Sequence, residues 1–445
     1  MPASAERAFA DRIDRAPLPF DAARAEALLA GADPALGRGA LGELVRGATG
    51  SSPYLARLAQ RHADWLAGAV AEPPERVMNT LLAEMAAEVA GGTAQGPVRR
   101  ALRQAKARAA LLIALADLGG VWGLEEVMAA LTRLADAAVT AAARWLLAAE
   151  LRAGKLPGLD ETALEGGAGY ILLAMGKMGA GELNFSSDID LIALFDDARF
   201  DGAHVLEARA RYIHVTRQLV KLISENTEDG YVFRTDLRLR PSPSTTPVCM
   251  SVDAAERYYE SVGRSWERAA HIKARPLVDV AAGDAYLETL APFIWRRHLD
   301  FAAIEDAHDM LRMIRAQKAR FTAGSLPGHD LKLGPGGIRE IEFFAQTRQL
   351  IVGGRDPDLR VPTTLGALDA LVAAGRIEGG TRDTLAGDYR ALRTVEHRLQ
   401  MMEDCQTHAV PKAPEARARL AMLCGEADST AFERRLSERL ARVHA

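Results

Sequence analysis

The stretch GKMGAGELNFSSDIDLIALF, from Gly176 to Phe195, is the most informative part of this 445-residue sequence. It begins with a glycine-rich turn and ends in an apolar run, Ile189 to Phe195, that only Asp190 interrupts. Asp188 and Asp190 are two residues apart on an expected strand, so their carboxylates point to the same face, roughly 6–7 Å apart. Two carboxylates this close repel each other unless a cation lies between them. Because charge in an apolar run is expensive, the pair indicates a functional site.

Small and basic residues just before the two acids are suited to binding phosphate. Three glycines allow the backbone to come close to a ligand: Gly176, Gly179 and Gly181. Lys177 supplies a point charge, and Ser187 adds a hydroxyl and an amide donor beside the acids. We expect Gly176, Lys177 and Ser187 to contact phosphate groups.

A third carboxylate, Asp236, lies in the stretch Tyr231 to Arg240, where apolar and charged residues alternate. The alternation predicts a half-buried strand whose charged face is formed by Arg234, Asp236, Arg238 and Arg240. Paired carboxylates, a third carboxylate and a basic fringe are what two-metal phosphoryl or nucleotidyl transfer needs. In this interpretation the acids hold Mg²⁺ or Mn²⁺, and Arg238 contacts phosphate.

The remaining sequence predicts a mostly helical protein. Leu, Ala and Val recur at three- and four-residue spacing from Asp21 to Leu151, and a further helical pattern extends from about His204 to Glu225. The pattern after Val252 is helical again, with a glycine-rich turn at 334–337 that opens a helix from Ile338 to about Val352. Between these regions, Tyr170 to Met175 is typical of a buried strand. We predict an α+β fold with a small mixed sheet, divided into an N-terminal helical domain (1–160), a core (161–283) and a C-terminal helical bundle domain (284–445).

The composition argues against several classes of protein. With 55 basic and 59 acidic residues, the net charge of −4 does not suit a protein that coats nucleic acid. No segment reaches the ~18 apolar residues of a membrane span. The three cysteines are too few and too scattered for a disulfide framework or a cysteine-based zinc site. We therefore expect a cytoplasmic protein with neither nucleic acid nor membrane as a partner.

Lysine is scarce in this chain, which has 8 lysines and 47 arginines, so a lysine carries more information than an arginine. Lys273 and Arg275 are therefore the next candidates for phosphate contacts, although a solvated helix end explains both equally well. Glu342 and Gln346 share a helix face through their i, i+4 spacing. They either border the site or cap the C-terminal helical domain, and we favour the second interpretation.

Four blocks of the sequence resemble bacterial glutamine synthetase adenylyltransferase/adenylyl-removing enzymes. The blocks are GELNFSSDIDL (181–191), YVFRTDLRLRP (231–241), SWERAAHIKAR (265–275) and LGPGGIREIEFFAQ (333–346). These enzymes are similar to the nucleotidyltransferases with the DNA polymerase β-like fold, whose signature is a glycine pair followed by Asp-hydrophobic-Asp. Lys177 occupies the second position of that pair, where the signature has Gly or Ser. The resemblance implies a polymerase β-like core.

The full-length enzymes resemble a tandem duplication of two catalytic units with opposing activities, and this chain has one. The forms ELNFSSDIDL and GGIREIEF resemble the N-terminal, adenylyl-removing unit. The resemblance implies that Asp188, Asp190 and Asp236 bind two metal ions while orthophosphate attacks the AMP–tyrosine linkage of adenylylated glutamine synthetase, giving ADP. It also implies a PII-type signal protein, in its uridylylated form, as a partner. The charged helical pattern up to Ala445 suggests an isolated half or a truncated piece of such an enzyme.

Two other functions stay open from the sequence. The same site could run forward, as ATP-dependent adenylylation or uridylylation of a regulatory protein. Alternatively, the chain could be a helical signalling module whose core only binds a nucleotide. Three acids with little solvent around them argue against the module, because nucleotide binding alone does not need them.

Overall fold

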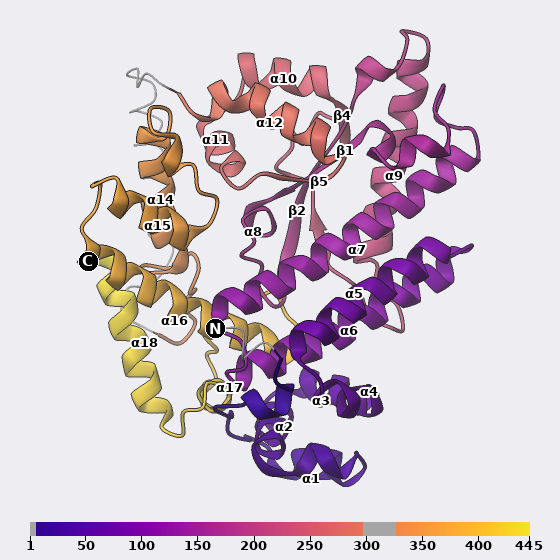
Figure 1. Ribbon diagram of the computed structural model, residues 1–445. Coiled ribbons are helices and arrows are strands. Elements are labelled where there is room, and N and C mark those ends of the chain that lie inside the picture. The colour runs from indigo at the N-terminus through magenta and orange to yellow at the C-terminus, as the bar shows by residue number, and fades with distance from the viewer. Residues whose placement is uncertain (1–5, 297–325) are drawn as a thin grey trace.

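Two neighbouring strands with matching apolar runs form the centre of the fold. β1 (Tyr170–Met175) and β2 (Asp188–Phe195) pair antiparallel, with Met175 opposite Asp190. β1 is buried along its whole length because helices cover both faces of the sheet, which explains why its sequence does not alternate. The computed structural model describes residues 6–296 and 326–445 (Figure 1).

Three short strands complete a five-stranded mixed sheet. β5 (Arg275–Val278) pairs antiparallel with β1, whereas β3 (Arg234–Asp236) and β4 (Cys249–Ser251) lie parallel to β2. The strand order is β3-β2-β1-β5, and β4 pairs with the C-terminal half of β2. The predicted α+β fold with a small mixed sheet is confirmed.

Helices cover both faces of this sheet (Figure 1). One face packs against α10 (Val252–Ser261) and α12 (Val280–Ile294). The other face packs against α7 (Leu124–Arg152) and α9 (His204–Ser224). The α9 helix confirms the helical pattern predicted from about His204 to Glu225.

Alternate side chains of the central strands belong to two different cores. Ile192 and Leu194 pack in the cluster beneath α10 and α12, whereas Leu191 and Ala193 belong to the larger core beneath α7 and α9. Side chains of a strand alternate between faces, so Asp188 and Asp190 continue the row of Ile192 and Leu194. This row leads to the end of the sheet where the C-terminal helices meet the core.

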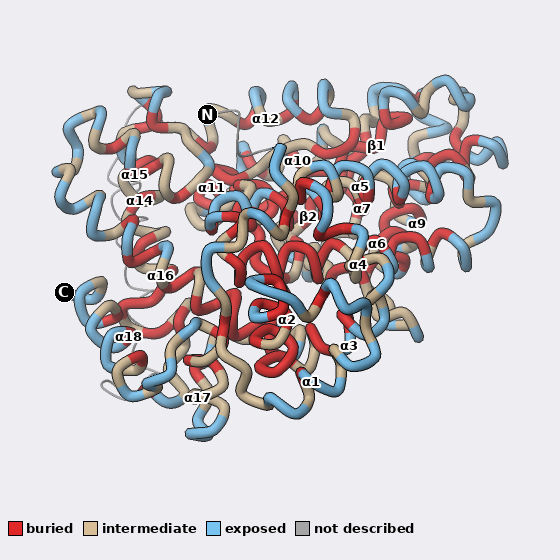
Figure 2. The backbone as a smooth tube through the Cα atoms, turned by 60° about the horizontal axis from the view of Figure 1, so that its bottom comes forward, coloured by how far each residue is buried: buried red, intermediate tan, exposed pale blue. Residues whose placement is uncertain are grey.

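The leading region is a helical layer, as predicted. Its long helices α6 and α7 carry continuous buried stripes, which Figure 2 shows in red. Trp122 is buried and Trp145 is partly buried, and their indole N–H groups donate to Glu75 and to the Gly92 carbonyl, so both are core anchors. The helices before α7 are α1 (Ala22–Ala30), α2 (Gly39–Ser51), α3 (Pro53–Arg61), α4 (Ala63–Ala69), α5 (Pro74–Gly91) and α6 (Gln95–Leu118).

The C-terminal helices pack beside the end of the sheet that carries the acids. The glycine-rich segment before Ile338 opens α14, as predicted, and Gly336 has a φ of +74°. A Cβ atom on Gly336 would lie 1.8 Å from the Leu440 carbonyl oxygen, so only glycine fits there. The helices are α14 (Ile338–Val352), α15 (Thr364–Ala373), α16 (Gly379–Glu403), α17 (Pro414–Leu423) and α18 (Ser429–His444).

Two predictions about local structure are wrong. The strand expected over 231–240 is reduced to the three residues of β3, because Arg240 turns inward and donates to four loop carbonyl oxygens, those of Leu237, Pro243, Thr246 and Pro247. The region after Val252 is not helical throughout, since β5 interrupts it. A four-residue strand between two helices is too short for hydrophobic periodicity to reveal.

A single connected hydrophobic core links the three regions predicted as domains. It extends from Phe9 through the sheet to Leu440. The predicted boundary at 283/284 falls inside α12, which packs on β1 and β5. The division into three domains stays a prediction. Within the described residues, no helix has both the length and the apolar composition needed to cross a membrane.

Candidate active site

Strand pairing brings three acids together at one end of the sheet. β3 lies parallel to β2 with Asp236 paired to Asp190, so two carboxylates occupy neighbouring positions on adjacent strands. Asp188 precedes Asp190 by two residues on the same face of β2. One carboxylate oxygen from each of Asp188, Asp190 and Asp236 lies within 4.8 Å of the others. The structure thus brings together the acids that the sequence suggested from two separate stretches.

The turn after β1 leaves room for this cluster. Gly176 lies next to Met175, the residue paired with Asp190, and its φ is +56°. A Cβ atom on Gly176 would lie 2.6 Å from the Asp190 Oδ2 atom. Gly179 serves another purpose, since a Cβ atom at this position would lie 1.8 Å from the Lys273 carbonyl oxygen and collide with it. Gly176 therefore makes space at the site, whereas Gly179 allows two backbone segments to pack closely.

The electrostatics of the cluster are those of a cation site. Burial raises the pKa of Asp190 to about 7, and the neighbouring charges of Asp188 and Asp236 add to the effect. The pKa of Asp236 shifts in the opposite direction. Burial raises this pKa, but the hydrogen bonds and charge of Arg238 outweigh the effect of burial and hold the pKa below its usual value. Arg238 Nε donates to both carboxylate oxygens of Asp236, at 3.0 and 2.9 Å. An acid that is buried among like charges is stabilised when a cation binds beside it.

The donor set fits Mg²⁺ or Mn²⁺. Carboxylate oxygens are the protein ligands that these hard cations prefer, and three of them converge from two strands. The described residues around the cluster place no histidine or cysteine among its ligand atoms, so the set does not suit zinc. Asp188, Asp190 and Asp236 are therefore the residues that could hold the metal.

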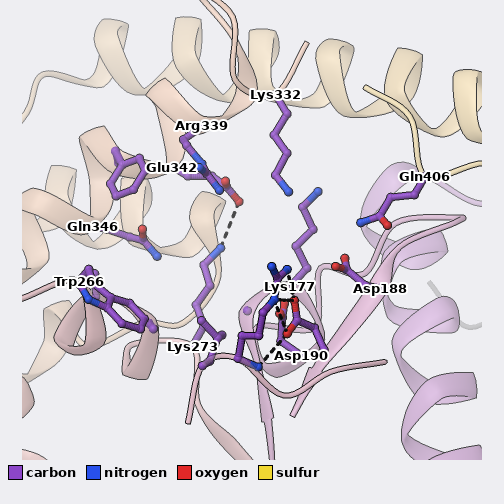
Figure 3. A pocket seen from close by; sticks show the side chains of 17 residues that line it. Lys177, Asp188, Asp190, Trp266, Lys273, Lys332, Arg339, Glu342, Gln346 and Gln406 are labelled. Atoms are coloured by element: carbon purple, nitrogen blue, oxygen red, sulfur yellow. Dashed lines mark hydrogen bonds and ion pairs between the residues drawn. The ribbon is translucent and has the colours of Figure 1, made fainter. Parts of the chain in front are cut away.

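A cavity of about 570 Å³ opens directly above the acids (Figure 3). Its walls come from the sheet, from α11 (Ser265–His271), from α14 and from the loop that contains Lys332. Three of the eight lysines in the chain line it, namely Lys177, Lys273 and Lys332. The cavity combines an acidic floor with basic walls, the arrangement that metal ions and phosphate groups need together.

Lys177 is a buried cation that Glu396 partly neutralises. Its Nζ atom is buried, lies 3.6 Å from Glu396 Oε1, and has no hydrogen-bond partner within the described part of the chain. Burial lowers the pKa of Lys177 to about 7, and Lys332 also lowers it, although Glu396 acts in the opposite direction. In Figure 3 the amino ends of Lys177 and Lys332 point toward each other. Two facing ammonium groups favour an anion between them.

Lys273 is held by two acids. Its Nζ atom donates to Glu182 Oε2 at 3.1 Å and to Glu342 Oε1 at 3.3 Å. Glu182 also accepts hydrogen bonds from the backbone and side chain of Thr364 at the start of α15. Lys273 therefore lines the cavity and also ties the loop before β2 to the C-terminal helices.

The loop that leads into β2 is fixed by α16. Arg393, which is fully buried, donates to the Glu182 carbonyl oxygen and to Asn184 Oδ1. Gln400, about two turns of helix further along α16, accepts a hydrogen bond from the Ser186 backbone N–H at 2.9 Å. The position of Asp188 thus depends on a helix about two hundred residues later in the chain.

Not all of the residues that the sequence predicts to contact phosphate line the cavity. Gly176, Lys177, Lys273 and Arg238 line the cavity. Ser187 is buried beside the acids, and its hydroxyl lies 3.4 Å from Asp188 Oδ1. Arg275 does not line the cavity; it donates to both carboxylate oxygens of Asp136 on α7, each at 2.9 Å.

The interpretation of Glu342 and Gln346 as caps of the helical domain is wrong. Both side chains line the cavity from α14, and Gln346 points into it (Figure 3). Their shared helix face lines the cavity because the glycine-rich turn before Ile338 sets the direction of α14. The i, i+4 spacing identified the face correctly but could not say what it faces.

Several lining residues were missed from the sequence: Trp266, Lys332, Arg339, Phe343 and Gln406. The scarcity of lysine is a signal that could have found Lys332, because it singled out Lys273. No comparable signal marks Arg339, one of 47 arginines. Trp266 and Phe343 both lie in the blocks quoted above, but nothing in their own spacing marks them as cavity residues.

A small mixed sheet that presents three carboxylates from adjacent strands beside a basic cavity defines the nucleotidyltransferase class, and the chain falls within it. More narrowly, the chain belongs to the glutamate-ammonia ligase adenylyltransferase family, whose sequence profile matches residues 42–289, more than half of the chain. A second profile, that of the GlnD PII-uridylyltransferase, matches residues 308–445.

Curated relatives carry a consistent name. A protein of Bradyrhizobium sp. (strain ORS 278), named bifunctional glutamine synthetase adenylyltransferase/adenylyl-removing enzyme, is 50% identical over 383 residues, which is 86% of this chain and 39% of the relative. Proteins of the same name from Bradyrhizobium diazoefficiens and Xanthobacter autotrophicus are each 48% identical; they cover 95% and 88% of this chain and 42% and 40% of their own length. The chain thus spans about two-fifths of the length of these relatives.

Proposed function

We propose that this chain removes AMP from an adenylylated tyrosine of glutamine synthetase by phosphorolysis. An oxygen of orthophosphate attacks the phosphorus of the AMP group, the bond to the tyrosyl oxygen breaks, and ADP and free tyrosine result. The observation that carries the proposal is the cluster of Asp188, Asp190 and Asp236 on the floor of a cavity with basic walls. The names of the relatives support glutamine synthetase as the target.

The acids would hold two Mg²⁺ or Mn²⁺ ions. When bound, such ions supply positive charge that stabilises the transferring phosphoryl group and the leaving oxygen. The protein's own contribution is to fix the geometry: β2 and β3 orient the carboxylates, and Arg238 holds Asp236 in place. No side-chain nucleophile is needed, because orthophosphate is itself the attacking group.

The basic walls support phosphorolysis because this reaction must hold two anions at once. The AMP phosphate lies at the acids, and the attacking orthophosphate needs a second site within bonding reach. Lys177 and Lys332 face each other above the acids, and Arg339 reaches in from α14 (Figure 3). We propose that these cations, with the Gly176 backbone, hold the two phosphate groups against their mutual repulsion.

The direction of the reaction and the regulatory partner are parts of the same proposal. The forms ELNFSSDIDL and GGIREIEF favour removal of AMP over its addition. The match of residues 308–445 to a PII-uridylyltransferase profile supports a PII-type signal protein as the regulator. Its uridylylated form is what the family resemblance of the sequence implies. We propose that this reaction takes place in the cytoplasm. The forward reaction, transfer of AMP from ATP, is the second candidate, because the relatives are named for both activities.

Product analysis tests the proposal. The chain is incubated with adenylylated glutamine synthetase, orthophosphate and Mg²⁺, and the nucleotides released are separated by chromatography. We expect ADP in an amount equal to the tyrosine freed, and none with Asp190→Asn. Release of AMP would show hydrolysis instead, and adenylylation of unmodified glutamine synthetase with ATP would favour the forward reaction.

A further inference from the structure

The cavity has one end that the acids and lysines do not account for. In Figure 3 Trp266 lies on the side of Lys273 away from Asp188 and Asp190. Apolar side chains line this end, from α11 and from α14: Trp266, Ala269, Ala270 and Phe343. A phosphate group has no use for an apolar wall, so this end suits another part of a ligand.

Two helix faces build the apolar end. Trp266 and Ala270 are four residues apart on α11, and Phe343 and Gln346 are three apart on α14, so each pair shares one face. The two helices contact each other, and Ala269 packs in one small cluster with Phe343. The alanines are short enough to leave the indole of Trp266 exposed to the cavity.

Trp266 differs from the tryptophans that anchor the leading helices. It is partly exposed, it belongs to none of the hydrophobic clusters of the described residues, and its indole N–H makes no hydrogen bond there. Trp122, in contrast, is buried and bonded to Glu75. A flat aromatic ring on a cavity wall is a stacking surface for a planar group such as a nucleobase.

Gln346 supplies the polar group that such a base requires. Its amide points into the cavity (Figure 3), and within the described chain it has no hydrogen-bond partner. Glu342, one turn earlier, is already occupied by Lys273. A glutamine amide matches the donor and acceptor pair on the edge of adenine, whereas guanine presents two acceptors at the corresponding positions.

We propose that Trp266 stacks on the adenine of the AMP group and supplies affinity for the base, and that Gln346 pairs with the edge of the base and supplies specificity for adenine. The proposal rests on the proposed function and deepens it. A cavity of about 570 Å³ is within the usual range for small-molecule sites and leaves room for both a base and two phosphate groups.

Calorimetric titration with ADP and with ribose 5-phosphate, both in Mg²⁺, separates stacking from phosphate binding. We expect Trp266→Ala to weaken ADP binding roughly 5- to 150-fold, the range for loss of one stacked base. Binding of ribose 5-phosphate should change less than about twofold, because it has no base. Trp266→Phe should keep most of the ADP affinity, and Trp65→Ala, on a distant surface, should change neither ligand.

A second pair of titrations tests base reading. The ratio of the dissociation constants for GDP and ADP should fall at least about tenfold in Gln346→Leu, because the amide that distinguishes the bases is gone. Equal weakening of both nucleotides would overturn the role of Gln346. Equal weakening of ADP and ribose 5-phosphate in Trp266→Ala, or no weakening of either, would overturn the stacking role.

These outcomes are distinct from a failure of the proposed function. If the wild-type chain binds no ADP in Mg²⁺, the result contradicts both the phosphorolysis and the adenine subsite. If the wild-type chain binds ADP and Trp266→Ala binds it equally well, only the adenine subsite falls. In that case the apolar end would serve another planar group, of which the target tyrosine is the obvious one.

Discussion

At the scale of single residues, Asp190 shows the conflict between stability and function most clearly. It lies at the end of a buried apolar row, beside two other acids, on the strand that forms the centre of the sheet. A protein selected only for stability would place an apolar side chain there, since burial of like charges is costly. The conflict is resolved when a cation binds, which is why the cluster is best understood as a metal site.

Replacement of either β2 acid should affect stability and activity in opposite ways. In the metal-free chain at about pH 8, Asp188→Asn and Asp190→Asn each remove like-charge repulsion, so the free energy of unfolding should be unchanged or rise by roughly 0.2–1 kcal/mol. The rate of ADP formation should fall more than a hundredfold, a cost of roughly 3 kcal/mol in the transition state. Thermal melting without metal and ADP assays with metal measure the two effects.

Glu84→Gln, which removes an exposed acid from the middle of α5, is the control for the general change in charge and should alter neither quantity. If an Asn variant melted much lower than the wild type and remained active, the acids would be structural rather than catalytic.

The pKa of Asp190 also predicts how metal affinity depends on pH. Burial, together with the charges of Asp188 and Asp236, raises this pKa to about 7 in the metal-free chain. Below about pH 7 the carboxyl group is protonated, so a metal ion must displace a proton, and affinity should fall by up to about tenfold for each pH unit. Above about pH 8 the affinity should be flat.

Calorimetry with Mn²⁺ in two buffers of different ionisation enthalpy checks this, because it counts released protons. We expect about one proton at pH 6 and close to none at pH 8. An affinity that is equal at the two pH values would contradict the assignment of Asp190 as a buried ligand.

The sequence was most informative where a residue breaks its local pattern. Asp188 and Asp190 were identifiable because they interrupt an apolar run, and Lys273 because lysine is rare. Arg393 could not be found in this way, although it is fully buried and holds the loop before β2, because one arginine among 47 carries no signal. Its role depends on a contact between segments about two hundred residues apart.

At the scale of elements, α16 determines the shape of the site although it contributes little to the lining of the cavity. It carries a row of fully buried polar residues, which include Arg393, Glu396 and Gln400. These residues bind the loop before β2, and Glu396 lies beside Lys177. Buried hydrogen bonds of this kind fix one geometry, and they are costly to break.

Loss of Arg393 should therefore be severe. Arg393→Met removes one of the cations beside Glu396 and the donor to Asn184 Oδ1 from a buried network, so we expect a loss of about 3–5 kcal/mol in the free energy of unfolding. Urea-induced unfolding measures it. Arg390→Met, on the exposed face of the same helix, removes a surface ion pair with Glu125 and should cost about 0–1 kcal/mol. Equal losses in the two variants would contradict the role given to α16.

Long elements with a strong period were predictable, and short ones were not. β1, α9 and the start of α14 were placed from hydrophobic runs, from helical periodicity and from a glycine-rich turn. β3 and β5 have three and four residues, and hydrogen bonds to β2 and β1 define them rather than any pattern of their own. Tertiary pairing decides such strands, and a single sequence does not display it.

At the scale of the whole molecule, the hydrophobic core is continuous from the leading helices to the last helix. Ser52, at the start of α3, is fully buried and donates to the Met401 carbonyl oxygen at 2.6 Å, so the first and last regions are joined by hydrogen bonds as well. We expect the chain to unfold as one cooperative unit, although its sequence predicts three domains. The ratio of calorimetric to van't Hoff enthalpy should be close to one. Separate transitions for leading and trailing regions would contradict this.

The central claim is that orthophosphate, and not water, accepts the AMP group. The most direct measurement uses orthophosphate labelled on phosphorus, with adenylylated glutamine synthetase and Mg²⁺, and locates the label by phosphorus NMR or chromatography. The account predicts that the label appears in the β-phosphate of ADP, in an amount equal to the tyrosine freed, and that Asp188→Asn abolishes it. Unlabelled AMP as the nucleotide product, with the label left in orthophosphate, would contradict the account.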